Sequence, residues 1–290
     1  MCDRLILPLS WALSGVRSRV GWCGLRRAVG HSGAVTVELN RQASRRTLGT
    51  ETLLVLGLSL GQSAVYATVS IVAKLTAEGG LSNQTASLNT SQSARPYLDL
   101  TYQLLGIAFA LLPVLLAVHL VNRDPGDAVR TLGLDGRRPA SDLARGVGLT
   151  ALIGLPGLAL FWVAAQLGLN ASLVPAALPD YWWAVPVLIL AALKNAILEE
   201  VIVVGYLVTR LRQLGWRVGV IIATSAVLRG SYHLYQGFGA FVGNVVMGIV
   251  FGYFFLRTRR VMPLIVAHTL LDIFAFVGYA LLPREWFDWL

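Results

Sequence analysis

The chain has 290 residues, of which 56% are hydrophobic and only 13% are charged, with a mean hydropathy of +0.65. Soluble globular domains contain about 25% charged residues, so this composition excludes that class and predicts a protein that crosses a membrane several times. The formal net charge is +9. Its basic residues form short clusters between apolar segments, which argues against nucleic-acid binding. The two cysteines, Cys2 and Cys23, support neither a disulfide framework nor a cysteine metal site.

Residues 1–50 are rich in arginine and lack an apolar segment long enough to cross a membrane. Arg4 followed by the apolar run 5–16 faintly resembles a signal peptide. Cleavage there would leave an arginine-rich end outside the cell, against the topology derived below. We therefore predict a flexible cytoplasmic arm over 1–50, or a start codon assigned too early, followed by a membrane domain over 51–290.

Seven apolar segments follow, and each is long enough to cross a bilayer as a helix of about 20 residues. In chain order they cover residues 52–74, 100–121, 146–167, 183–209, 218–236, 238–256 and 261–282. The sequence therefore predicts an all-α polytopic membrane protein with about seven transmembrane helices.

The arginines of the connectors predict the orientation of these spans. Arginine clusters occupy the connectors 122–145, 210–217 and 257–260, whereas 75–99 has only Arg95 and 168–182 has none. A cytoplasmic N-terminus puts every cluster on the cytoplasmic side, as the positive-inside rule requires. We therefore predict a multi-pass protein of a bacterial inner (cytoplasmic) membrane, with the C-terminus outside.

Ionisable side chains inside the last four spans are the candidates for chemistry, because each carboxylate at membrane depth costs about 3 kcal/mol. Glu199 and Glu200 are adjacent on the fourth span, and Asn195 extends their polar face by one turn. The later spans carry Arg229 with His233, then Asn244, then His268 with Asp272.

Helical spacing predicts how these groups face one another. Arg229 and His233 are four residues apart, so both lie on one helix face. The same holds for His268 and Asp272. Adjacent Glu199 and Glu200 diverge by about 100° around the helix. One carboxylate can therefore face a reaction centre while the other meets a supporting partner.

Three segments, in this order, carry these residues: Glu199–Leu207 with the Glu-Glu pair, Leu228–His233, and Pro263–Asp272. They resemble the three motifs of the CAAX prenyl protease and bacteriocin-processing (CPBP, Abi) family of intramembrane proteases. The resemblance covers roughly residues 100–282. It implies a four-helix catalytic core over 183–282 that hydrolyses a peptide bond in a membrane-associated peptide or protein.

Two residues depart from the family pattern. Val204 stands where the first motif usually has arginine, and Arg229 stands where the second usually has phenylalanine. Our hypothesis is a swap, in which Arg229 supplies the missing charge from the neighbouring helix and pairs with Glu200. Many bacterial members of the family act where no prenylation occurs, so the CAAX substrate does not transfer with the fold.

The resemblance also implies roles for the candidate residues. Glu199, with Glu200 beside it, would be the general base that takes a proton from water. His233 and His268 would hold that water or stabilise the oxyanion, and Asp272 would orient His268 or serve as a further ligand. The remaining polar residues, Arg229, Asn195 and Asn244, are predicted to support the site.

A metalloprotease-like site is the open question about cofactors. Glu199, His233 and His268 are the right ligand types for a divalent metal such as zinc. The chain has no His-Glu-x-x-His helix, and the family's metal dependence is debated, so we predict no tightly bound zinc.

The predicted helix ends create a difficulty for this site. Measured from those ends, Glu199 lies at a depth of about 15 Å, His268 at about 12 Å and His233 at about 24 Å, so straight helices would not bring them together. A tilted or displaced fifth helix would close the gap.

Two alternatives come from other functional classes. Glu, Asp and His in membrane spans also form proton relays, so a proton-coupled transporter is the first. A catalytically inactive family member that acts as an immunity or scaffold protein is the second. The lipid bilayer is a predicted partner, nucleic acid is not, and the oligomeric state is left open.

Overall fold

The computed structural model describes residues 45–283 and residue 285. The chain divides into two units, Met1–Arg46 and Thr47–Leu290, and nearly all described residues belong to the second. Most of the predicted arm therefore lies outside the described residues. Its last residues, from Arg45, are part of a helix that runs to Gly57.

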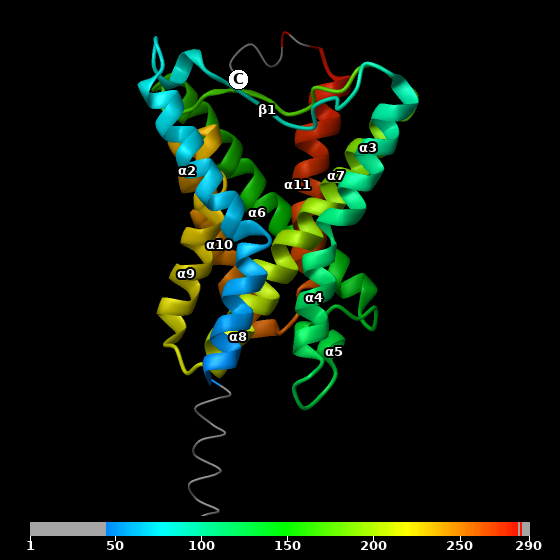
Figure 1. Ribbon diagram of the computed structural model, residues 1–290, viewed down its shortest axis with the longest axis vertical. Helices are drawn as coiled ribbons and strands as arrows, with labels where there is room; N and C mark the ends of the chain where they lie inside the picture. The colour runs from blue at the N-terminus through cyan, green and yellow to red at the C-terminus, as the bar shows by residue number, and fades with distance from the viewer. Residues whose placement is uncertain (1–44, 284, 286–290) are drawn as a thin grey trace, which may run out of the picture. The chain divides into compact units, whose positions relative to one another are not determined.

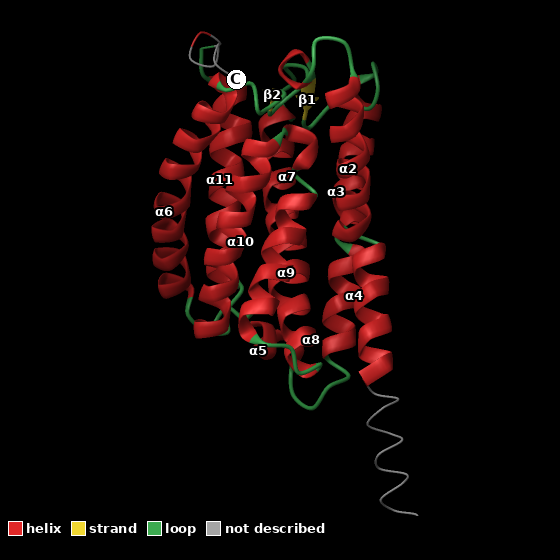
Figure 2. Cartoon of the chain, turned by 90° about the vertical axis from the view of Figure 1, so that its left-hand side faces the viewer, coloured by secondary structure: helices red, strands yellow, loops and turns green. Residues whose placement is uncertain are grey.

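The described part of the chain is almost entirely helical (Figure 1, Figure 2). After Arg45–Gly57, the long helices are α2 Leu60–Thr76, α3 Pro96–Ala110, α4 Leu112–Val121, α6 Pro139–Gln166, α7 Ala184–Glu199, α9 Val218–Ser231, α10 Phe238–Thr258 and α11 Met262–Leu281. Shorter elements are α5 Ala128–Leu132, α8 Leu207–Gln213, a π-helical segment Glu200–Tyr206, and 3-10 turns at Leu81–Asn83 and Leu234–Gln236. The strands β1 Thr85–Ser87 and β2 Ser172–Val174 pair in parallel, with Thr85 opposite Ser172.

The all-α polytopic membrane fold is confirmed. Four described segments are long and apolar enough to cross a membrane: Pro96–Val121, Pro139–Gln166, Phe238–Thr258 and Met262–Leu281. A fifth is the pair Arg45–Gly57 and Leu60–Thr76, if this pair counts as one span despite its 51° bend. Helices occupy all seven predicted segments, but by length and composition only four or five of them pass as spans.

The predicted span 218–236 is wrong in its extent. Its helix, α9, has 14 residues and ends at Ser231, so it is about 21 Å long and shorter than a hydrocarbon core of about 30 Å. A turn follows and ends at Gly237, whose φ of +124° favours glycine. A Cβ at Gly237 would lie 2.5 Å from the Cα of Asn170, so the close approach of these two backbone segments also requires glycine there.

The core lies around the π-helical segment, where Val201, Ile202, Val203 and Val204 are fully buried. The helices α9 and α10 pack closely beside it. Their backbones are so near each other that a Cβ on Gly248 would lie only 2.7 Å from the Cα of Ala226. Small residues allow such close backbone approach in membrane proteins. This tight packing brings α9 against the segment that carries the paired glutamates.

Candidate active site

The paired glutamates lie where the fourth predicted span changes its helical geometry. Glu199 is the last residue of α7, and Glu200 is the first residue of the π-helical segment that ends at Tyr206. Wider turns of this type are rare and occur frequently at functional sites. Ser225 of α9 donates a hydrogen bond of 2.8 Å to the carbonyl of Val203 within it, which ties the segment to the neighbouring helix.

Glu200 is held by two cationic or titratable partners from other helices. An Arg229 Nη2 lies 2.5 Å from Glu200 Oε1, and both side chains are fully buried. The Nδ1 atom of His268 lies 2.7 Å from the same oxygen. Arg229 also packs its guanidinium 5.5 Å from the ring centre of Phe251. This geometry contains the contact that the swap hypothesis expects between Arg229 and Glu200.

Glu199 has a different environment, with its side chain 10% exposed. Its Oε2 accepts a hydrogen bond of 2.8 Å from the hydroxyl of Tyr232. Around the same oxygen lie an Arg229 Nη1 at 3.6 Å, the His233 Nε2 at 3.7 Å and the His268 Nε2 at 4.0 Å. Within the described chain the His233 Nε2 is buried without a hydrogen-bond partner. It can therefore bind a small ligand next to Glu199.

Asp272 connects the site to α7. Its Oδ1 lies 3.7 Å from the His268 Nε2, and its Oδ2 accepts a hydrogen bond of 3.2 Å from Asn195. Lys194 in turn donates to the side-chain oxygen of Asn195. The structure therefore brings together seven of the eight predicted residues, namely Asn195, Glu199, Glu200, Arg229, His233, His268 and Asp272. The exception is Asn244, whose side-chain amide donates a hydrogen bond to the carbonyl of Ala240 in its own helix.

The expected conflict in depth between Glu199 and His233 disappears because the fourth helical run is longer than predicted. It continues through α8 to Gln213, so Glu199 lies about 21 Å from that end. After a short turn, α9 starts at Val218 and runs in the opposite direction to α8. Tyr232 lies about 21 Å from this start. The two levels therefore match, and no tilted fifth helix is needed to place His233 beside Glu199.

Tyr232 is a site residue to which sequence reasoning gave no role. A signal was available, because Tyr232 follows Arg229 by three residues and so shares its helix face. Gln236 was missed as well. Its side-chain amide lies 3.4 Å from the Nδ1 of His233, and the spacing of three residues was the available signal for this contact.

The donor atoms do not fit a bound metal ion. Among the described residues, no group of three or more His, Cys, Asp or Glu side chains is arranged to hold one. The His268 Nδ1 is engaged with Glu200, and the guanidinium of Arg229 already places a positive charge 3.6 Å from the Glu199 oxygen. A cation at that oxygen would be repelled by this charge.

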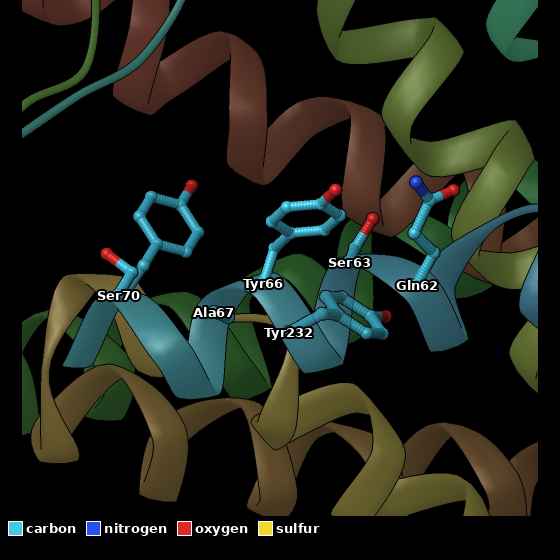
Figure 3. A pocket seen from close by; sticks show the side chains of 7 residues that line it. Gln62, Ser63, Tyr66, Ala67, Ser70 and Tyr232 are labelled. Atoms are coloured by element: carbon cyan, nitrogen blue, oxygen red, sulfur yellow. The ribbon is translucent and has the colours of Figure 1, made fainter. Parts of the chain in front are cut away.

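An open pocket of about 530 Å³ adjoins the site (Figure 3). It is lined by Gln62, Ser63, Tyr66, Ala67 and Ser70 of α2 together with Tyr232 and Tyr235. Three of the α2 residues, Gln62, Tyr66 and Ser70, recur every fourth position and so form one polar helix face. Tyr232 lines the pocket and hydrogen-bonds to Glu199, so the pocket reaches the carboxylate through one side chain.

Residues 181–274 match the family model described as Type II CAAX prenyl endopeptidase Rce1-like. The predicted resemblance to the CAAX protease family is confirmed. The Rce1-like segment covers about a third of the chain and includes both glutamates, both histidines and Asp272. No curated protein and no solved structure matches the chain.

Proposed function

We propose that the protein is an intramembrane endopeptidase in which Glu199 activates water to hydrolyse a peptide bond of a membrane-associated polypeptide. The Rce1-like match supports a peptidase of the CAAX type in general. The observation that carries the finer proposal is the contrast between the two carboxylates. Glu200 is fully buried between Arg229 and His268, whereas Glu199 keeps some exposure and accepts a hydrogen bond from Tyr232, which lines the open pocket.

In this mechanism a water molecule binds between Glu199 and the His233 Nε2, and Glu199 takes its proton as general base. The water oxygen then adds to the scissile carbonyl carbon. Charge develops on the carbonyl oxygen, and the nearby Arg229, His268 and Tyr232 are the available groups that can stabilise it. When the C–N bond breaks, Glu199 returns the proton to the leaving amine nitrogen.

Glu200 has a positioning role in this proposal. It accepts from His268 Nδ1 and therefore fixes the ring so that Nε2 points to Glu199 and Asp272. A carboxylate that accepts a hydrogen bond from one ring nitrogen of a histidine commonly sets the tautomer and orientation of that ring. Neutralising Glu200 would therefore disturb His268 before it disturbs water activation.

The proposal favours hydrolysis over proton-coupled transport for a structural reason. The titratable groups of the site converge on one Glu199 oxygen, with distances of 3.6 to 4.0 Å to Arg229, His233 and His268. A relay across the membrane needs such groups in succession along the membrane normal. Uptake driven by a proton gradient in liposomes, without peptide cleavage, would favour the transporter instead.

Removing the carboxylate of Glu199 tests the chemistry. We expect Glu199→Gln to lower the rate of peptide cleavage by about 100- to 10,000-fold, the usual contribution of a general base. The assay uses purified protein in detergent with a fluorogenic peptide library. Glu78→Gln, which changes an exposed glutamate of the loop after α2, is the matched control and should keep full activity.

Equal activity of Glu199→Gln and the wild-type protein would contradict the proposed base. The same assay with a metal chelator tests the prediction that no tightly bound zinc takes part. Activity that disappears with the chelator and returns with zinc would overturn that prediction.

The pocket beside Tyr232 is the proposed binding place for the substrate backbone. We expect Gln62→Ala and Tyr66→Ala each to raise KM about fivefold while kcat changes less than twofold, because each removes a contact made before the chemical step. Val65→Ala and Val69→Ala alter exposed residues of α2 outside the pocket lining and serve as controls. A fall in kcat without a change in KM would contradict a role in substrate binding.

The proposal also includes the orientation that the arginines predict, with the N-terminus in the cytoplasm of a bacterial cell and the C-terminus outside. A phosphatase that is active only outside the cytoplasm, fused after Leu290, should be active. An inactive phosphatase with a normally expressed fusion would reverse the orientation.

A further inference from the structure

A second pocket, of about 450 Å³, lies away from the paired glutamates. It is lined by Arg130, Thr131, Thr209, Arg212, Gln213 and Arg259. Its arginines come from three separate parts of the chain, namely α5, α8 and the turn after α10. Figures 1 and 2 both show α5 and α8 at the end opposite the paired strands. The pocket therefore lies where several helices end.

The positive charges of this pocket have no carboxylate partner within the described chain. Arg130, Arg212 and Arg259 form none of the ion pairs that the structure contains there. In contrast, Arg123, Arg137, Arg210 and Arg260 each pair with an aspartate or glutamate. Burial and the nearby charge of Arg212 lower the pKa of Arg259. An anion bound between these side chains would relieve that repulsion.

Thr209 supplies an independent observation. It is only 6% exposed, it lines the same pocket, and its hydroxyl has no hydrogen-bond partner in the described part of the chain. Buried hydroxyl groups normally have a partner, and losing it costs free energy. Gln213 cannot provide one at low cost, because its amide already donates to Asp124 and accepts from Arg210. The free hydroxyl therefore points to a ligand in the pocket.

The conformation of Arg259 agrees with a side chain retained for binding. Its φ is +55°, a left-handed conformation that favours glycine or asparagine. Trp216, 45% exposed, follows α8 closely, and tryptophans are enriched at the interface between lipid and water. The position of Trp216 agrees with a pocket at the level of the lipid headgroups.

We propose that this pocket binds the phosphate group of an anionic phospholipid. Guanidinium groups form paired hydrogen bonds to phosphate oxygens, and basic pockets between membrane helices bind anionic headgroups. Arg130, Arg212 and Arg259 neutralise the phosphate, and the Thr209 hydroxyl donates to one of its oxygens. This site is independent of peptide hydrolysis and does not require that Glu199 be a catalytic base.

Native mass spectrometry and thermal unfolding of the purified full-length protein test the proposal. The probes are phosphatidylglycerol, phosphatidylcholine and inorganic phosphate, each added to detergent-solubilised protein. We expect phosphatidylglycerol to remain bound and to raise the unfolding temperature, and phosphatidylcholine not to do so. An equal effect of inorganic phosphate at a matched concentration would contradict the lipid source and assign the pocket to free phosphate.

Variants separate the pocket from general attraction between charges. The triple variant Arg130→Gln, Arg212→Gln, Arg259→Gln should bind phosphatidylglycerol at least about tenfold more weakly than the wild type. The control is Arg138→Gln, Arg145→Gln, Arg217→Gln, which makes the same change in net charge at exposed arginines outside the pocket. Equal loss of lipid in both triple variants would overturn the proposal.

Thr209→Val gives a result that a purely structural role would not. Because it removes a buried hydroxyl without a partner, it should maintain or raise the unfolding temperature of the lipid-free protein. The same variant should reduce the temperature shift caused by phosphatidylglycerol. A full shift in Thr209→Val would show that the hydroxyl does not contact the lipid, against the proposal.

Discussion

The buried contact between Glu200, Arg229 and His268 is the constraint on which the rest of the site depends. A charged group without a partner is very costly at this depth, so the three side chains must stay together once the helices are inserted. Glu200 belongs to the π-helical segment, Arg229 to α9 and His268 to α11, so the contact fixes three helices relative to one another. It also leaves Glu199, the adjacent carboxylate, to accept a hydrogen bond from Tyr232, which lines the pocket.

The sequence was sufficient to predict the helical membrane fold and most of the site. Apolar segments mark every long helix, and residue types in helical register place His268 beside Asp272. Periodicity could not predict where α9 stops, because Tyr232, Leu234 and Tyr235 continue the apolar pattern after the helix has ended at Ser231. The apolar pattern also did not predict that the fourth helical run continues to Gln213, because the last residues of this helix are polar.

Contacts across turns and between distant elements explain what remained unpredicted. Tyr232 reaches Glu199 only because α9 runs antiparallel to α7 and α8 at matching depth. The pocket of Arg130, Arg212 and Arg259 depends on three chain segments meeting, which no local pattern encodes. Conversely, the contact between Arg229 and Glu200 could be inferred from sequence, because a buried glutamate needs a cation and the neighbouring helix carries one.

A double-mutant cycle on Glu200 and Arg229 tests the central claim most directly. Each single change, Glu200→Met or Arg229→Met, leaves one buried charge without its partner and should lower the free energy of unfolding by about 3 to 5 kcal/mol. The double variant removes both charges, so we predict that it loses clearly less than the sum of the two single losses. Additive losses, measured by unfolding the purified protein in detergent, would contradict the account.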